Sequence, residues 1–363
     1  MRALIILAVV MGSLTACAAD PLVTRWANQW LAAERAGLQG EPQAIEDFKQ
    51  LAAEAPTRYD VDAARFGQAR ALRAQGRHAE AFALFEDLGD RAMRRMDRAR
   101  ARYEMGRMAA TAGRKESATA LFRHLVETYP AQPAAMRSIQ LLRHFAERDG
   151  GPAERDTLDW LTRVYPTLAG TAIGDDLVYF GVEILYRWWR VSGSEVLARQ
   201  VEGLIGRLES RHYVSGHWDD AVWLLSRLYH RQGRFQEEIR ALGRILHTRE
   251  EPFFVGHYDT TYHWVGQLRI ARIHMMDLGA PEDAAETYAW FVSTFPYSRW
   301  RDDARFWQGC ALLRAGQPEA AESAFATIAE IYPDSKYIAR LDAARSDPHS
   351  ALCEPKVFEE GSW

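Results

Sequence analysis

The chain has few cysteines, little net charge and no hydrophobic run long enough to span a bilayer. Its three cysteines, Cys17, Cys310 and Cys353, are too few for a disulfide scaffold and lack the spacing of metal ligands. A formal net charge of −4 over 363 residues argues against nucleic-acid binding. With 48% hydrophobic and 26% charged residues, the chain has the composition of globular domains or of one continuous array.

The sequence also lacks the short motifs of common catalytic sites. It contains no phosphate-binding glycine loop, H-E-x-x-H, G-x-S-x-G or paired C-x-x-C. Glutamates such as Glu237 and Glu238 are interpreted as solvated residues on a helix surface. We therefore expect no catalytic residue, no cofactor and no metal, and a protein that is not an enzyme.

The first residues have the pattern of a signal peptide. After Met1-Arg2, an apolar stretch of about a dozen residues runs to Leu14, shorter than the roughly 20 residues of a membrane-spanning helix. It ends in Leu14-Thr15-Ala16-Cys17, which resembles the bacterial lipobox. The resemblance implies cleavage before Cys17 and a diacylglycerol on its sulfur. With Ala18 next, it implies a lipid-anchored protein on the periplasmic face of the outer membrane; a plain secretory signal and a buried thiol are the alternatives.

An aromatic or aliphatic residue recurs along the chain at a nearly constant interval. A small residue stands four positions before five of these anchors, and a proline stands eight positions after five of them. This pattern predicts that each anchor lies on an amphipathic helix that a proline ends. The anchors are Phe48, Phe85, Phe122, Leu158, Leu197, Leu242, Tyr288 and Phe325, with gaps of 36 to 46 residues.

A preceding helix is predicted in each repeat, and it ends at a glycine such as Gly76, Gly113 or Gly316. Small residues within it, such as Gly106 and Gly309, allow the two helices to approach closely. The pattern resembles the tetratricopeptide repeat, strongly near 62–95, 99–132 and 302–335 and weakly in the middle. The resemblance implies an all-α fold: a right-handed superhelical solenoid of about eight antiparallel helix pairs with a groove for a partner.

Four segments are expected on this basis. They are a signal peptide (1–16), the lipidated cysteine with a short linker (17–22), the solenoid (23–345, with a divergent middle at 135–262) and a disordered tail (346–363). A disulfide between Cys310 and Cys353 is left open.

Two junctions share an aromatic-Pro-x-Ser turn, Phe295-Pro296-Tyr297-Ser298 and Tyr332-Pro333-Asp334-Ser335. The proline is expected to stop one helix and the serine to cap the next. The turn resembles those of envelope repeat proteins, notably the barrel-assembly lipoprotein and the periplasmic partner of the Tol system. The chain has more helix pairs than the former and lacks the N-terminal coiled coil of the latter, so it is assigned to neither.

A basic stretch is the first candidate for partner binding. On one continuous helix its arginines would fall within about 100° of arc and form a ridge that contacts an anionic partner. A solvated face paired with nearby carboxylates is the alternative interpretation. The ridge consists of Arg91, Arg94, Arg95, Arg98 and Arg102.

The second candidate is an aromatic and histidine-rich connection where the repeat interval lengthens. Inserted loops on one face of a solenoid often bind partners. The separation of His257 and His263 by six residues does not suit two metal ligands on one helical face, so interface or structural roles are favoured. The candidate residues are Tyr258, Tyr262, His263 and Trp264.

Together these features predict a non-catalytic scaffold or adaptor in outer-membrane or envelope assembly. Its partners would be envelope proteins held in the groove and the membrane, reached through lipid on Cys17, with no nucleic acid. The alternative is a peptidoglycan-binding accessory protein or a degenerate relative of the lytic transglycosylases, which share a helical superhelix.

Overall fold

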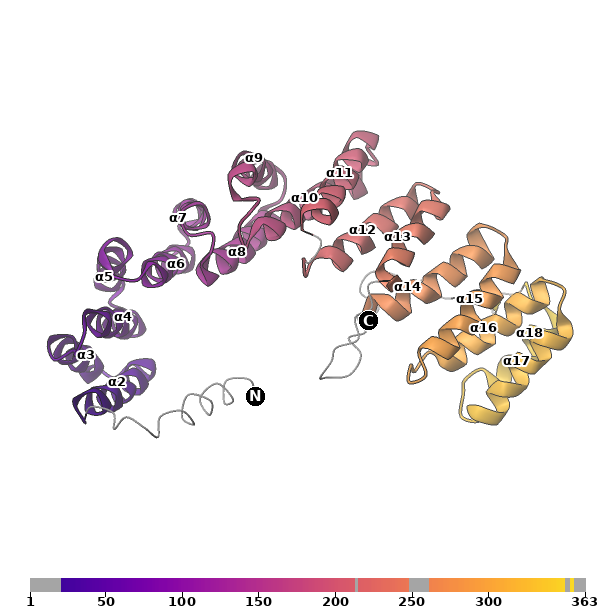
Figure 1. Ribbon diagram of the computed structural model, residues 1–363, viewed down its shortest axis with the longest axis horizontal. Coiled ribbons are helices and arrows are strands. Elements are labelled where there is room, and N and C mark those ends of the chain that lie inside the picture. The colour runs from indigo at the N-terminus through magenta and orange to yellow at the C-terminus, as the bar shows by residue number, and fades with distance from the viewer. Residues whose placement is uncertain (1–20, 213–214, 248–260, 350–352, 356–363) are drawn as a thin grey trace. The chain divides into compact units, whose positions relative to one another are not determined.

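The computed structural model describes residues 21–212, 215–247, 261–349 and 353–355. Over these residues it contains helices and no strand, as the ribbon in Figure 1 shows. The chain divides into two compact units, Met1–Leu177 and Val178–Trp363. In the described ranges, no helix is both long enough and apolar enough to cross a bilayer.

The first unit consists of four consecutive helix pairs, each packed on the next. They are α2 (Pro21–Gln39) with α3 (Gln43–Ala53), α4 (Arg58–Ala74) with α5 (His78–Arg91), α6 (Arg95–Thr111) with α7 (Lys115–Thr128), and α8 (Pro133–Asp149) with α9 (Gly151–Leu168).

The pairing continues with α10 (Gly174–Ser192), whose first residues belong to the first unit and the rest to the second. The eight pairs in chain order confirm the predicted number and the all-α class. The remaining helices are α11 (Glu195–Arg211), α12 (Trp218–Arg231), α13 (Phe235–His247), α14 (Thr261–Arg272) with the π-helical turn η1 (Ile273–Asp277), α15 (Pro281–Thr294), α16 (Arg301–Arg314), α17 (Pro318–Ile331), the 3₁₀ turn η2 (Ile338–Arg340) and α18 (Leu341–Ser346).

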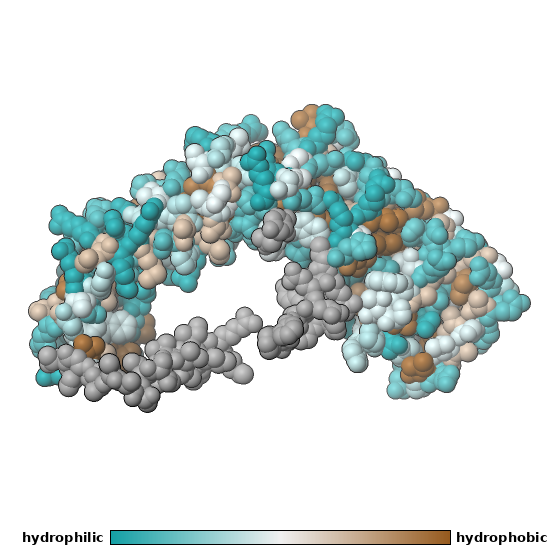
Figure 2. All heavy atoms as spheres, viewed as in Figure 1, coloured by the Kyte–Doolittle hydropathy of each residue, from teal (hydrophilic) through white to brown (hydrophobic). Residues whose placement is uncertain are grey.

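The predicted anchors lie on the second helix of each pair, and six of the eight are at most 1% exposed. Leu158 and Leu197 are wrong anchors because both are only half-buried, whereas Leu161 and Val201 fill the core of α9 and α11. The correction amounts to three or four residues, which is one helical turn and leaves the same face inward. Helical periodicity therefore predicted the buried face but not the register. Hydrophilic residues cover most of the face shown in Figure 2.

Glycines on the first helices make room for the anchor rings. A Cβ at Gly106 would stand 2.5 Å from the Phe122 ring, and one at Gly309 would stand 2.2 Å from the Phe325 ring. Such distances are far below van der Waals contact, so only glycine allows these helices to lie so close. The close approach expected from the sequence is confirmed at both positions.

Replacing Gly309 should therefore cost stability. We expect Gly309→Ala to lower the free energy of unfolding by about 1–3 kcal/mol, because a rigid ring buried in the core cannot move aside. Gly206→Ala in α11 is the matched control, since a Cβ there meets nothing within 4 Å. It should leave stability unchanged or raise it by up to about 1 kcal/mol through helix propensity. Urea denaturation compares them, and equal effects would contradict this account of the packing.

Two local expectations need correction. Pro166 does not end its helix, because α9 continues to Leu168 with the proline in its last turn. The φ of proline suits a helix, and in the last turn few helical hydrogen bonds follow the one that its missing N–H removes. The turn serines do not cap the next helix: Ser298 Oγ accepts a hydrogen bond from the backbone N–H of Trp300, which is itself the N-cap residue of α16.

Candidate protein-interaction site

A groove lies between α7 and α9 in the first unit, with α8 as its floor. Its volume is about 420 Å³, within the range of ligand pockets. Leu142, Phe145 and Ala146 of α8 supply an apolar floor, and Ala120 of α7 and Ala153 of α9 line the two sides. The Phe145 ring is half-buried and lies 6.2 Å from that of Phe122, so the floor rests directly on the core.

Charged pairs border this floor. Lys115 of α7 pairs with Asp149 at the end of α8, and its ammonium lies 5.3 Å from the centre of the Phe145 ring. Burial lowers the pKa of Lys115 below its usual value, and the positive charge of the neighbouring Arg148 lowers it further. Arg123 of α7 donates to Asp156 of α9 at 2.7 Å, so this pair joins the two sides of the groove.

The groove combines a small apolar floor with a border of oriented charges. An apolar side chain can be buried against Phe145, while the charged pairs offer donors and acceptors to the backbone or polar groups of the same ligand. This is the chemistry of peptide recognition.

The predicted arginine ridge is not one face of a continuous helix. The chain leaves the helix at Ala92–Arg94, between α5 and α6, because Ala92 is buried with extended backbone and the N–H of Met93 donates to the buried Asp62 at 2.7 Å. Arg91 therefore ends one helix while Arg95 begins another.

The ridge arginines are also largely engaged within the fold. Arg91 pairs with Asp87 at 3.3 Å, Arg94 with Asp97 at 2.7 Å and Arg102 with Asp90 at 2.8 Å. Arg95 donates to the carbonyl of Thr128, and Arg98 has an enclosed Nε without a hydrogen-bond partner. Three of the five thus follow the alternative interpretation of a face paired with carboxylates.

The aromatic candidates lie on a helix rather than in a loop, because α14 begins at Thr261. The hydroxyl of Tyr262 donates to Asp220 at 2.7 Å, and His263 is only 3% exposed. Trp264 stacks on Trp300 with ring centres 5.8 Å apart. These three side chains therefore pack between helices, and Tyr258, like Cys17, lies outside the described residues.

The interpretation of Glu238 as a solvated surface residue is wrong, because this residue is completely buried on α13. One carboxylate oxygen accepts from Nε of Arg269 on α14 at 2.5 Å, and the other lies 2.8 Å from Nδ1 of His230 on α12. Arg269 is 4% exposed, and burial lowers its pKa while Glu238 opposes that effect. The trio joins three successive helices of the second unit and leaves no carboxylate oxygen facing a pocket.

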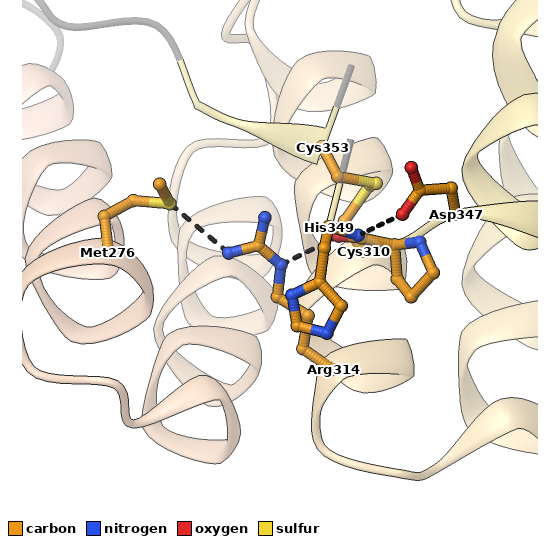
Figure 3. Close-up of a disulfide and its surroundings, with 7 residues drawn as sticks. Met276, Cys310, Arg314, Asp347, His349 and Cys353 are labelled. Carbon is orange, nitrogen blue, oxygen red and sulfur yellow. Dashed lines mark hydrogen bonds between the residues drawn. A yellow bond between two sulfur atoms is a disulfide. The ribbon is translucent and has the colours of Figure 1, made fainter. Parts of the chain in front are cut away.

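Cys310 and Cys353 form a disulfide, with their Cα atoms 5.5 Å apart, as Figure 3 shows. The bond holds the chain after α18 against α16. Nε of Arg314 donates to the carbonyl of Pro348 at 2.8 Å, and its Nη1 approaches the sulfur of Met276. Where it is described, the tail that was expected to be disordered is therefore attached to the second unit.

The groove residues were missed although the sequence carried a signal. Opposite charges spaced by about one repeat form ion pairs in both units, with separations of 31 to 34 residues. Equivalent positions of neighbouring repeats lie side by side in a solenoid, so a search for such spacing would have found them. Examples are Lys115 with Asp149, Arg123 with Asp156, Arg234 with Glu202 and Arg269 with Glu238.

Comparison with known proteins agrees with the repeats. The tetratricopeptide repeat model matches residues 42–93 and 274–336. The Assembly Chaperone of RpL4 (Acl4), residues 1–338, is 16% identical, covers 84% of this chain and 98% of its own, and has a TM-score of 0.26. The TPR domain of P58(IPK) is 15% identical, with coverage of 89% and 88% and a TM-score of 0.24. No curated protein matches. The two matched segments are thus similar to tetratricopeptide repeats, and they lie within an all-α array of helix pairs.

Proposed function

We propose that this chain is a lipid-anchored scaffold of the bacterial envelope that holds a segment of a protein partner in the groove between α7, α8 and α9. The observation that carries the proposal is the groove itself, an apolar floor at Phe145 between two ion pairs. The ligand that fits is a peptide segment that presents one apolar side chain flanked by polar groups.

Two features support an extracytoplasmic location. The Cys310–Cys353 disulfide belongs to proteins of oxidising compartments, such as the periplasm. The sequence Leu14-Thr15-Ala16-Cys17 supplies the acylation site. We place the body of the protein in the periplasm and the lipid on Cys17 in the outer membrane.

Filling the groove tests the partner proposal. Ala120 is exposed on α7 and lines the groove, so Ala120→Arg should block it without harming the helix, because arginine is a good helix former. We expect crosslinking in intact cells followed by purification to recover the partner roughly tenfold less well, since a blocked central contact typically costs that much or more.

The matched control is Ala83→Arg, at the exposed position of α5 one repeat earlier and outside the groove. It should recover the partner as the unaltered chain does. Equal recovery by both variants would exclude this groove. Recovery of no specific protein, with retention on purified sacculi instead, would favour peptidoglycan as the ligand and overturn the scaffold proposal.

A further inference from the structure

Exposed apolar side chains of the first unit gather at one edge. Among its described residues, seven large apolar side chains are exposed, and only Leu31 and Leu38 lie elsewhere. The other five stand in the first turns of α2, α4, α6 and α8 or in the turn before α6. They are Val23, Tyr59, Met93, Met96 and Met136, each 43% to 48% exposed.

These positions share an edge because the first helices of successive antiparallel pairs run in the same direction. Contacts between repeats confirm it. Nε1 of Trp26 in α2 donates to the carbonyl of Leu51 near the end of α3, which leads into α4. The guanidinium of Arg94 lies 5.5 Å from the centre of the Tyr59 ring. We call this side of the first unit the first-turn edge; its helices are labelled in Figure 1.

Each of the four helices also places an arginine at the first-turn edge. Arg25, Arg58, Arg95 and Arg137 are all exposed, and none of them forms an ion pair within the described structure. The α-helix dipole disfavours a cation near a helix N-terminus. Arg58 and Arg95 are the first residues of their helices and carry this locally unfavourable charge, whereas Arg25 and Arg137 are the fifth residues of theirs.

The described carboxylates of the same edge form no ion pair with these four arginines and accept hydrogen bonds from other groups instead. Asp60 accepts from Thr57, Asp62 from the N–H of Met93, and Asp97 from Arg94. Asp90 accepts from Arg102, and Glu54 accepts from Gln50. The edge thus presents guanidinium groups without a carboxylate partner, interleaved with apolar side chains, which suits an anionic lipid surface.

The start of the first helix identifies the occupant. α2 begins at Pro21, four residues after Cys17, so a lipid on that cysteine stays within about 14 Å of the first-turn edge even if the linker is fully extended. We infer that the first-turn edge lies on the membrane, with Tyr59 and the methionines at the headgroup level and the arginines on anionic headgroups. This inference rests on the proposed lipid anchor.

Labels at the two ends of one helix test this orientation. Met96 begins α6, and Thr111 ends it on the opposite edge. Each is changed to cysteine in the lipidated full chain, whose other cysteines are acylated or bonded, and a fluorophore is attached. The protein is placed on vesicles of phosphatidylcholine with phosphatidylglycerol that carry a headgroup nitroxide. We expect the Met96→Cys label to be quenched several-fold more than the Thr111→Cys label.

Charge reversal provides the second readout. Arg95→Glu and Arg137→Glu should each weaken the quenching roughly fivefold, as expected for loss of one basic residue near an anionic surface. Circular dichroism checks that both variants remain helical. Arg148→Glu, an exposed change near the end of α8 and so on the opposite edge from Arg137, should leave the quenching unaltered.

The outcomes separate the two proposals. A chain that fails to attach to vesicles, or a Cys17→Ala chain that attaches through acylation elsewhere, would overturn the lipid anchor of the proposed function. Attachment with equal quenching of both labels would overturn the orientation alone. If vesicles of phosphatidylcholine alone quenched the Met96→Cys label as strongly as vesicles with phosphatidylglycerol, the role of the arginines would be overturned. A first-turn edge covered by an acidic protein would instead leave this label shielded from solvent but unquenched.

Discussion

Glu238→Gln should lower the free energy of unfolding by about 3–5 kcal/mol, the cost of removing one partner from a buried ion pair. The change preserves the shape of the side chain but leaves the guanidinium of Arg269 buried without its counter-ion. Because Glu238 also lies 2.8 Å from His230, the substitution disturbs α12, α13 and α14 together. Urea denaturation followed by circular dichroism measures the loss.

Glu237 is the matched control for this prediction. It is the preceding residue on the same helix, and its side chain is 35% exposed, with Arg234 at 3.4 Å. Glu237→Gln should leave stability nearly unchanged because water screens the lost charge. If both glutamine variants unfolded at the same urea concentration, the buried trio would not be what holds these helices together.

Removing the disulfide is expected to have the next largest effect. Cys353→Ser opens a crosslink between residues 43 positions apart, which should cost about 2–4 kcal/mol through the greater freedom of the unfolded chain. The segment around Pro348 should then gain access to protease, because it loses a covalent tie to α16 and keeps weaker ones such as the hydrogen bond from Arg314. Thermal unfolding and limited proteolysis report the two effects.

A reductant supplies the control for this second prediction. It should lower the melting temperature of the unaltered chain to that of Cys353→Ser and leave the variant where it is. If the variant melted with the unaltered chain under oxidising conditions, the bond would add nothing to the second unit.

The two effects concern different parts of the second unit. The Glu238 trio joins three helices through charges buried between them, whereas the disulfide fastens the last described residues to α16. Because the two sites share no residue, the losses of a double variant should be nearly additive. A clear departure from additivity would indicate that the end of the chain and the trio unfold together.

The sequence alone determined that the chain is a series of helix pairs. Anchors such as Phe85 and Phe325 recur once per repeat, and the amphipathic pattern around each of them is that of a helix packed on a neighbour. The glycines that end first helices were also predicted correctly, since Gly76 and Gly316 both adopt positive φ. The number of helix pairs, eight, therefore follows from the sequence.

The tertiary structure alone decided which charges are paired and which are exposed. Glu237 and Glu238 are adjacent and identical, and only the packing of α12 and α14 buries the second of them. The arginines of 91–102 form a ridge only on an unbroken helix, and the chain leaves the helix where the N–H of Met93 donates to the buried Asp62 of α4. Helical periodicity is local and can be read from one segment, whereas burial and ion pairing depend on residues about one repeat away, which only the folded chain brings together.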